Sequence, residues 1–146
     1  MAATVVVTAL SVTGCSASGP VSAGNAYIPV PTTPGSTVAY LEIRNNGGPD
    51  ELLSVQTSVG GTVTLRAPRA AGTQVMAMHN VTDIPIPSDT TVHLAPNTYH
   101  LLITGASGLQ SGKAITLRLT FEHAGTISIT ALVTNPESGG SSYFLN

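Results

Sequence analysis

Residues 114–122 of this 146-residue chain read Ala-Ile-Thr-Leu-Arg-Leu-Thr-Phe-Glu, and this stretch decides the fold class. Its apolar and polar residues alternate strictly, which is the period-two pattern of a β-strand with one buried face. The apolar members are Ile115, Leu117, Leu119 and Phe121. The same alternation returns at residues 37–44 and 126–133. These segments predict strands that each place one apolar face against a common core.

Clusters of Gly, Pro, Asn and Asp separate these segments from further short strand candidates. We expect those strands at residues 26–30, 51–58, 62–66, 73–80, 91–94 and 99–104. Residues 83–89 carry two prolines, so they are expected only as a sheet edge or a loop. About eight short strands without an amphipathic helix predict a single all-β domain, an antiparallel sandwich or barrel.

The composition excludes several classes of function. Charged residues make up 8% of the chain and the formal net charge is -2, so the basic face that nucleic acid requires is missing. The acids occur singly, no serine has nucleophile-elbow spacing, and no glycine-rich phosphate loop stands between a strand and a helix. We therefore expect that the protein is not an enzyme.

The N-terminal segment resembles a bacterial lipoprotein signal. Residues 2–13 form an apolar run that is too short to span a bilayer. The run ends in Val12-Thr13-Gly14-Cys15, which resembles a lipobox. A plain secretory signal with an incidental Cys15 is the alternative. Because no basic residue precedes the apolar run, we expect the true start to lie upstream of Met1.

The lipobox reading predicts how the ends of the chain are organised. We expect residues 1–14 to be a signal peptide, Cys15 to carry lipid, and residues 15–25 to contain a flexible tether. Residues 135–146 are rich in Gly and Ser and are expected to be a tail. The protein would then be anchored to the bacterial cell membrane on its extracytoplasmic face.

Soft metal donors gather at two places in the sequence. Met76, Met78 and His79 stand close together, and His100 follows later. On an extended strand Met76 and Met78 share a face while His79 points the other way. Thioethers select Cu(I) and imidazole suits copper in either oxidation state. Equally, methionine often fills a core and single histidines are often surface residues, so the residue types alone leave both interpretations open.

Several segments share their order and spacing with one known family: Ala26-Tyr27-Ile28-Pro29, residues 39–45, residues 50–55, Val75-Met76-Ala77-Met78, residues 84–87, Tyr99-His100-Leu101-Leu102 and residues 117–125. Over these segments the chain resembles the PCuAC family of periplasmic copper chaperones. The resemblance implies a cupredoxin-like antiparallel β-sandwich over residues 26–134. It also implies Cu(I) binding for hand-over to a recipient such as cytochrome oxidase or another copper chaperone.

The resemblance further implies a four-residue copper site, of which this chain keeps two members. The motif methionine falls on Met78 and the second motif histidine on His100. The first histidine falls on Arg66 and the last methionine on Leu102, which offers no lone pair. Arg66 brings a permanent charge and no donor atom. At an effective dielectric constant near 20, that charge opposes a nearby Cu(I) ion by several kcal/mol.

Two functions from different classes remain open at this point. One is a weakened Cu(I) site made by Met78 and His100, with Met76 as a possible third donor. In this first case His79 is expected to face away from Met78, and His93 has no support from the motif. The other is a metal-free interaction or structural module on the cell surface that kept the sandwich and lost the metal.

Overall fold

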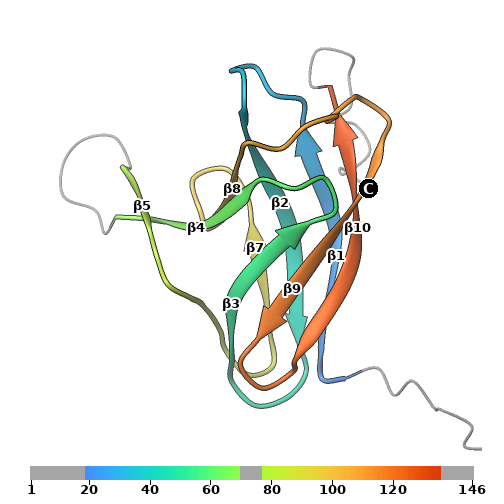
Figure 1. Ribbon diagram of the computed structural model, residues 1–146. Helices are drawn as coiled ribbons and strands as arrows, with labels where there is room; N and C mark the ends of the chain where they lie inside the picture. The colour runs from blue at the N-terminus through green and yellow to red at the C-terminus, as the bar shows by residue number, and fades with distance from the viewer. Residues whose placement is uncertain (1–18, 70–76, 136–146) are drawn as a thin grey trace, which may run out of the picture.

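The computed structural model describes residues 19–69 and 77–135, which form an all-β structure (Figure 1). No helix within those ranges is long and apolar enough to cross a membrane. The strands are β1 (Val21–Pro29), β2 (Ser36–Asn45), β3 (Asp50–Thr57), β4 (Thr62–Pro68), β5 (Met78–Asn80), β6 (Ile84–Ile86), β7 (Thr90–Leu94), β8 (His100–Thr104), β9 (Ala114–Phe121) and β10 (Thr126–Thr134).

The strands follow one path in the order β5-β4-β8-β2-β1-β10-β9-β3-β6, and β7 pairs with β2. The strands form two layers, and β2 takes part in both. Its residues 36–39 pair with β8 in one layer, and its residues 41–45 pair with β7 in the other. The chain therefore curls into a sandwich, as the alternating segments predicted. One pair departs from the antiparallel expectation, since β1 and β10 run parallel, with Ile28 opposite Val133.

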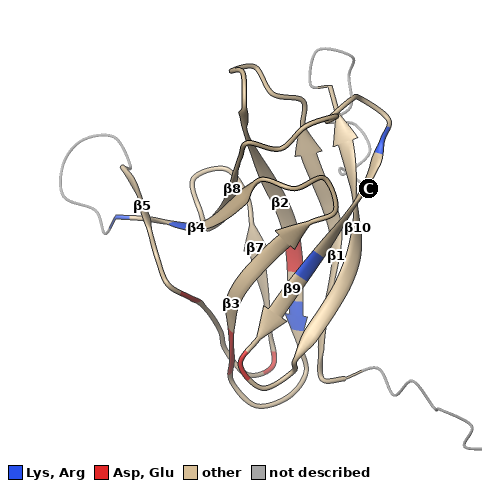
Figure 2. Cartoon of the chain, viewed as in Figure 1, with Lys and Arg blue, Asp and Glu red and all other residues tan. Residues whose placement is uncertain are grey.

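The core is built from the apolar positions that the alternation identified. In β9 every second residue is buried, and β2 buries Ala39, Leu41 and Ile43 in the same way. Fully burying one such aliphatic side chain stabilises the fold by about 1.5–3 kcal/mol. The sandwich thus rests on apolar burial, since the described residues contain few charged groups to contribute ion pairs (Figure 2).

The first strand corrects one predicted boundary. We expected the tether to extend to residue 25, but β1 begins at Val21, whose side chain is buried. The pairing of β1 with β2 shifts register between Gly24 and Tyr27, and Asn25 has a positive φ of 50°. This bulge breaks the alternation, so a period-two pattern starting at Val21 is not visible in the sequence.

Two other expectations concern the sheet edges. The proline-containing segment does supply an edge strand, because β6 pairs with β3 and ends the strand order. Of the strand expected over residues 73–80, the structure shows β5 at Met78–Asn80. Residues 70–76, including Met76, lie outside the described residues, as do residues 1–18 with Cys15 and the tail from 136 onward.

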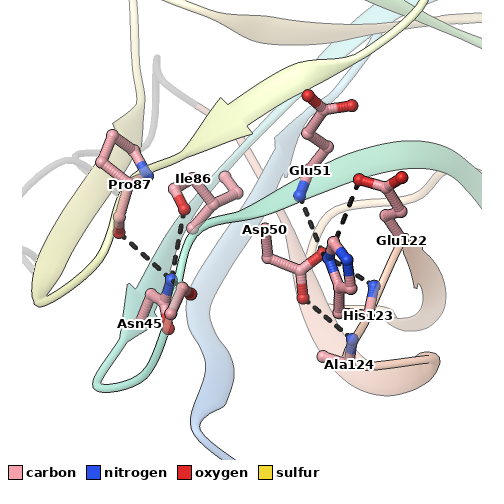
Figure 3. A network of polar contacts seen from close by, with 9 residues as sticks. Asn45, Asp50, Glu51, Ile86, Pro87, Glu122, His123 and Ala124 are labelled. Atoms are coloured by element: carbon pink, nitrogen blue, oxygen red, sulfur yellow. Dashed lines mark hydrogen bonds and ion pairs between the residues drawn. The ribbon is translucent and has the colours of Figure 1, made fainter.

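Buried polar side chains join the turns at one end of the sandwich (Figure 3). The Asn45 amide donates to the carbonyl oxygens of Gly48 at 2.7 Å and Ile86 at 3.2 Å, and so connects the β2–β3 turn to β6. Asp50 accepts hydrogen bonds from the backbone N–H groups of Glu51, His123 and Ala124 at 2.8, 2.9 and 2.8 Å. These contacts fix the β9–β10 turn against the start of β3.

The charge of Asp50 is stabilised in this position. Burial acts to raise the pKa of its carboxyl group, but the three backbone donors and the nearby His123 outweigh burial and lower the pKa below its ordinary value. Only 3% of the Asp50 side chain is exposed, whereas His123 is largely exposed. Asp50, the last residue of the turn Gly47-Gly48-Pro49-Asp50 between β2 and β3, therefore has a structural role.

Candidate metal site

Strand pairing places the candidate ligands on one face of the sheet. Arg66 on β4 lies opposite His100 on β8, and Pro68 lies opposite Met78 on β5. Opposed residues in antiparallel strands share a face, as do residues two apart on one strand. The intervening Leu65 and Leu101 are buried in the core. Arg66, His100 and Met78 therefore all lie on the outer face, away from that core.

Strand β4 separates the two soft donors. Neighbouring strands are about 4.8 Å apart, so the backbones of β5 and β8 are roughly 10 Å apart across β4. The β4–β5 hairpin lies at one end of the strand order and projects from the sandwich (Figure 1). Met78 and His100 are both half-buried. A shared metal ion would lie above β4, close to Arg66.

Arg66 connects the members of this face. Its Nη2 donates a hydrogen bond to the carbonyl oxygen of Met78 at 2.9 Å. Its Nε is buried and has no hydrogen-bond partner within residues 19–69 and 77–135. Sequence reasoning located Arg66 at a motif position, but it could not find the bond to Met78, because that bond depends on the register of β4 with β5.

His100 has the properties of a neutral imidazole. Burial lowers its pKa, and the nearby Arg66 charge lowers it further, while the backbone of Thr98 acts more weakly in the opposite direction. Its Nδ1 is buried without a hydrogen-bond partner in the described part of the chain. Its ring packs edge-on to Tyr40, with 6.2 Å between centroids. Neutral imidazole is the form that binds metal ions.

The remaining candidates lie elsewhere. His79 is opposite Ala67 on the inner side of the hairpin, so it faces away from Met78 as the alternation predicted. His93 on β7 lies beside Glu42, with 3.1 Å between Nδ1 and Oε1. Leu102 is opposite Thr64 and shares the outer face with His100. Among the described residues no group of three or more His, Cys, Asp or Glu side chains could hold a metal ion.

Comparison with known proteins agrees with this fold. The family model LpqE-like, described as "Putative lipoprotein LpqE-like", matches residues 21–133. No curated protein matches the sequence. The copper-bound PCuAC domain from PmoF2 is 21% identical with a TM-score of 0.68, and the match covers 81% of this chain and 95% of that one. The apo PCuAC domain from PmoF1 is 22% identical with a TM-score of 0.68, covering 81% and 96%.

The solution structure of the Cu(I) form of DR1885 from Deinococcus radiodurans is similar as well. It is 24% identical with a TM-score of 0.62, and the match covers 77% of this chain and 76% of that one. The predicted resemblance to PCuAC domains is thus confirmed by the fold. Because the family model spans most of the sequence, the chain belongs to the LpqE-like family and has the PCuAC fold.

Proposed function

We propose that this domain binds Cu(I) on the outer face of β4, β5 and β8 and hands it to another protein. Met78 and His100 are the proposed ligands, with Met76 as a third donor. The relatives of the same fold include a copper-bound PCuAC domain and a Cu(I) form of DR1885. The proposed role is binding and transfer, without catalysis, and cytochrome oxidase or another copper chaperone is the proposed recipient.

One observation carries the proposal: a neutral imidazole and a thioether occupy the same outer face. His100 has a lowered pKa and a buried Nδ1 without a well-formed hydrogen bond to any described residue. Met78 is the first residue of β5, on the hairpin that projects from the sandwich (Figure 1), and its side chain is half-buried. Both donors are soft or borderline ligands of the kind that Cu(I) prefers.

The same face also explains why we expect weak binding. Arg66 occupies a motif position between the two donors, and its charge repels a cation. Leu102 fills a second motif position without a lone pair. The proposed site therefore has lower affinity than a site with all four ligands.

We also propose that the domain is held outside the cytoplasm by a lipid on Cys15. The support is the lipobox-like sequence before Cys15 and the lipoprotein name of the family. Since β1 begins at Val21, the proposed tether between lipid and sandwich is short.

A second function is favoured by the contact between Arg66 and Met78. The guanidinium is hydrogen-bonded to the Met78 carbonyl oxygen and so stabilises the hairpin without any metal. This is the arrangement expected of a metal-free interaction or structural module that retained the sandwich. The two functions differ in whether Cu(I) binds at all.

Anaerobic Cu(I) titration against a chromophoric competitor distinguishes the copper-binding function from the metal-free module. The soluble part from Ser16 onward should bind one Cu(I), and Met78→Ala and His100→Ala should each weaken binding by tenfold or more. His93→Ala is the matched control, since that imidazole lies on β7 beside Glu42 and should leave binding unchanged. Wild-type protein that takes no Cu(I) from the competitor would establish the metal-free module instead.

A further inference from the structure

Arg66 carries a positive charge that no acid of the described residues neutralises. The ion pairs in residues 19–69 and 77–135 join only His93 and His123 to acids. Arg66 is half-buried, whereas every other arginine and lysine in those ranges is exposed. Removing an unpaired charge from water costs free energy. The guanidinium therefore favours an anion supplied from outside.

The hydrogen bonding of Arg66 points to the same need. Its Nη2 is bound to the Met78 carbonyl oxygen, but its buried Nε has no acceptor in the described part. Because Nε is buried, an acid from solvent does not reach it. The end-on fork of the two Nη atoms matches a carboxylate, which supplies the opposite charge and acceptors for the Nη donors that the Met78 carbonyl oxygen leaves free.

The surroundings of Arg66 are compatible with a bound carboxylate. Its partners across the sheet are Asn80 and His100, and its same-face neighbours along β4 are Thr64 and Pro68. None of these is acidic, so none repels an anion. The sequence between β4 and β5 also contains no Asp or Glu. Because Arg66 is only half-buried, part of its side chain remains open to solvent, although its Nε does not.

We propose that Arg66 is the anchor of a carboxylate-binding site on the outer face of the β4–β8 pair. The carboxylate comes from a small organic acid or from an acidic side chain of a docking protein. The site does not require copper. If Cu(I) binds as proposed above, a carboxylate on Arg66 offsets the repulsion, so the two ligands bind cooperatively and each raises the affinity of the other.

The apo protein tests the site directly. Sodium acetate replaces sodium perchlorate at constant ionic strength while the arginine Nε–H signals are followed by NMR. The Arg66 signal, identified by its loss in Arg66→Gln, should shift saturably, while the signals of the exposed Arg44 and Arg118 stay in place. No saturable shift, or equal shifts at all arginines, would overturn the carboxylate site whatever the protein does with copper.

Two further experiments identify the source of the carboxylate and test whether its binding is coupled to that of Cu(I). A capped peptide with one Glu, at the same carboxylate concentration, should bind more tightly than acetate if a docking protein supplies the acid, and equally if a small acid does. Acetate is a hard ligand and competes little for Cu(I). It should raise Cu(I) affinity on the order of fivefold in wild type and leave Arg66→Gln unchanged.

The outcomes of the copper arm are distinct. If acetate leaves the Cu(I) affinity of the wild-type protein unchanged, the proposed cooperativity is wrong. Absence of Cu(I) binding at every acetate concentration, with the acetate shift of Arg66 intact, would refute the copper proposal and leave the carboxylate site established.

Discussion

Arg66 and His100 lie directly opposite each other on β4 and β8, on the outer face of the sandwich. Burial lowers the pKa of His100 and the arginine charge lowers it further, which favours the neutral imidazole that binds metals. The same charge opposes the cation that the imidazole would bind. Arg66 therefore influences both the protonation of His100 and the expected affinity of the proposed copper site.

Restoring the two missing donors should strengthen Cu(I) binding. We expect Arg66→His with Leu102→Met to raise the affinity on the order of a hundredfold, since removing a charge a few ångströms from Cu(I) is worth about 2–3 kcal/mol. Competition titration measures the change, with circular dichroism to confirm folding. An unchanged affinity would show that the motif has been placed on the wrong residues.

Asp50 should control stability at low pH. We expect Asp50→Asn to lower the free energy of unfolding by about 2–3 kcal/mol at neutral pH, because three backbone donors lose a charged acceptor. Since the pKa of Asp50 is lowered in the folded state, its contribution is full above the ordinary value of 3.8 and disappears as pH falls through the lower folded value.

Urea unfolding at a series of pH values measures that difference. The gap between wild type and Asp50→Asn should narrow as the pH falls below 3.8. Glu122→Gln is the control, because this exposed acid also lies near His123 but accepts no comparable set of backbone bonds. A gap that stays constant down to the lowest pH would contradict the assigned role of the Asp50 charge.

In the turn before β4, substitution by alanine should be tolerated far better at Gly60 than at Gly61. A Cβ on Gly61 would lie 2.5 Å from the Thr104 carbonyl oxygen and 2.7 Å from the Ala106 nitrogen, whereas a Cβ on Gly60 would meet nothing within 4 Å. Both glycines have positive φ, which costs an alanine about 1–2 kcal/mol. Thermal unfolding should therefore show Gly61→Ala as clearly the more destabilised protein. Equal melting temperatures would contradict the close approach of this turn to the end of β8.

The sequence predicted the fold class and most strands because the apolar residues of β2 and β9 alternate without interruption. It missed the first part of β1, where the bulge at Asn25 hides the pattern. The parallel pairing of β1 with β10 was also missed, since local alternation carries no information on which distant strands become neighbours.

The candidate site was predictable in part. Residue types and the family motif identified Met78, His100, Arg66 and Leu102, and alternation predicted that His79 faces away from Met78. The contact of Arg66 with the Met78 carbonyl oxygen and the packing of His100 on Tyr40 depend on tertiary register. No one-dimensional pattern encodes these contacts.

The proposed lipid anchor depends on a single sulfur atom. We expect Cys15→Ser to release the protein from membranes when the full-length gene is expressed in a bacterial host, because a serine cannot form the thioether to lipid. Fractionation followed by immunoblotting measures the distribution, and wild type should remain with the membranes. Retention of the Cys15→Ser protein in the membrane fraction would contradict lipidation at this position.

The most direct test of the copper site is NMR of the protein during anaerobic Cu(I) addition. The chain has three methionines, so the methyl signal of Met78 can be assigned by substitution. We predict that this methyl signal and the His100 imidazole signals shift together, and that both shifts are complete at one equivalent of Cu(I). Cu(I) that leaves both residues unmoved, or that shifts the signals of His79, His93 or His123 instead, would contradict it.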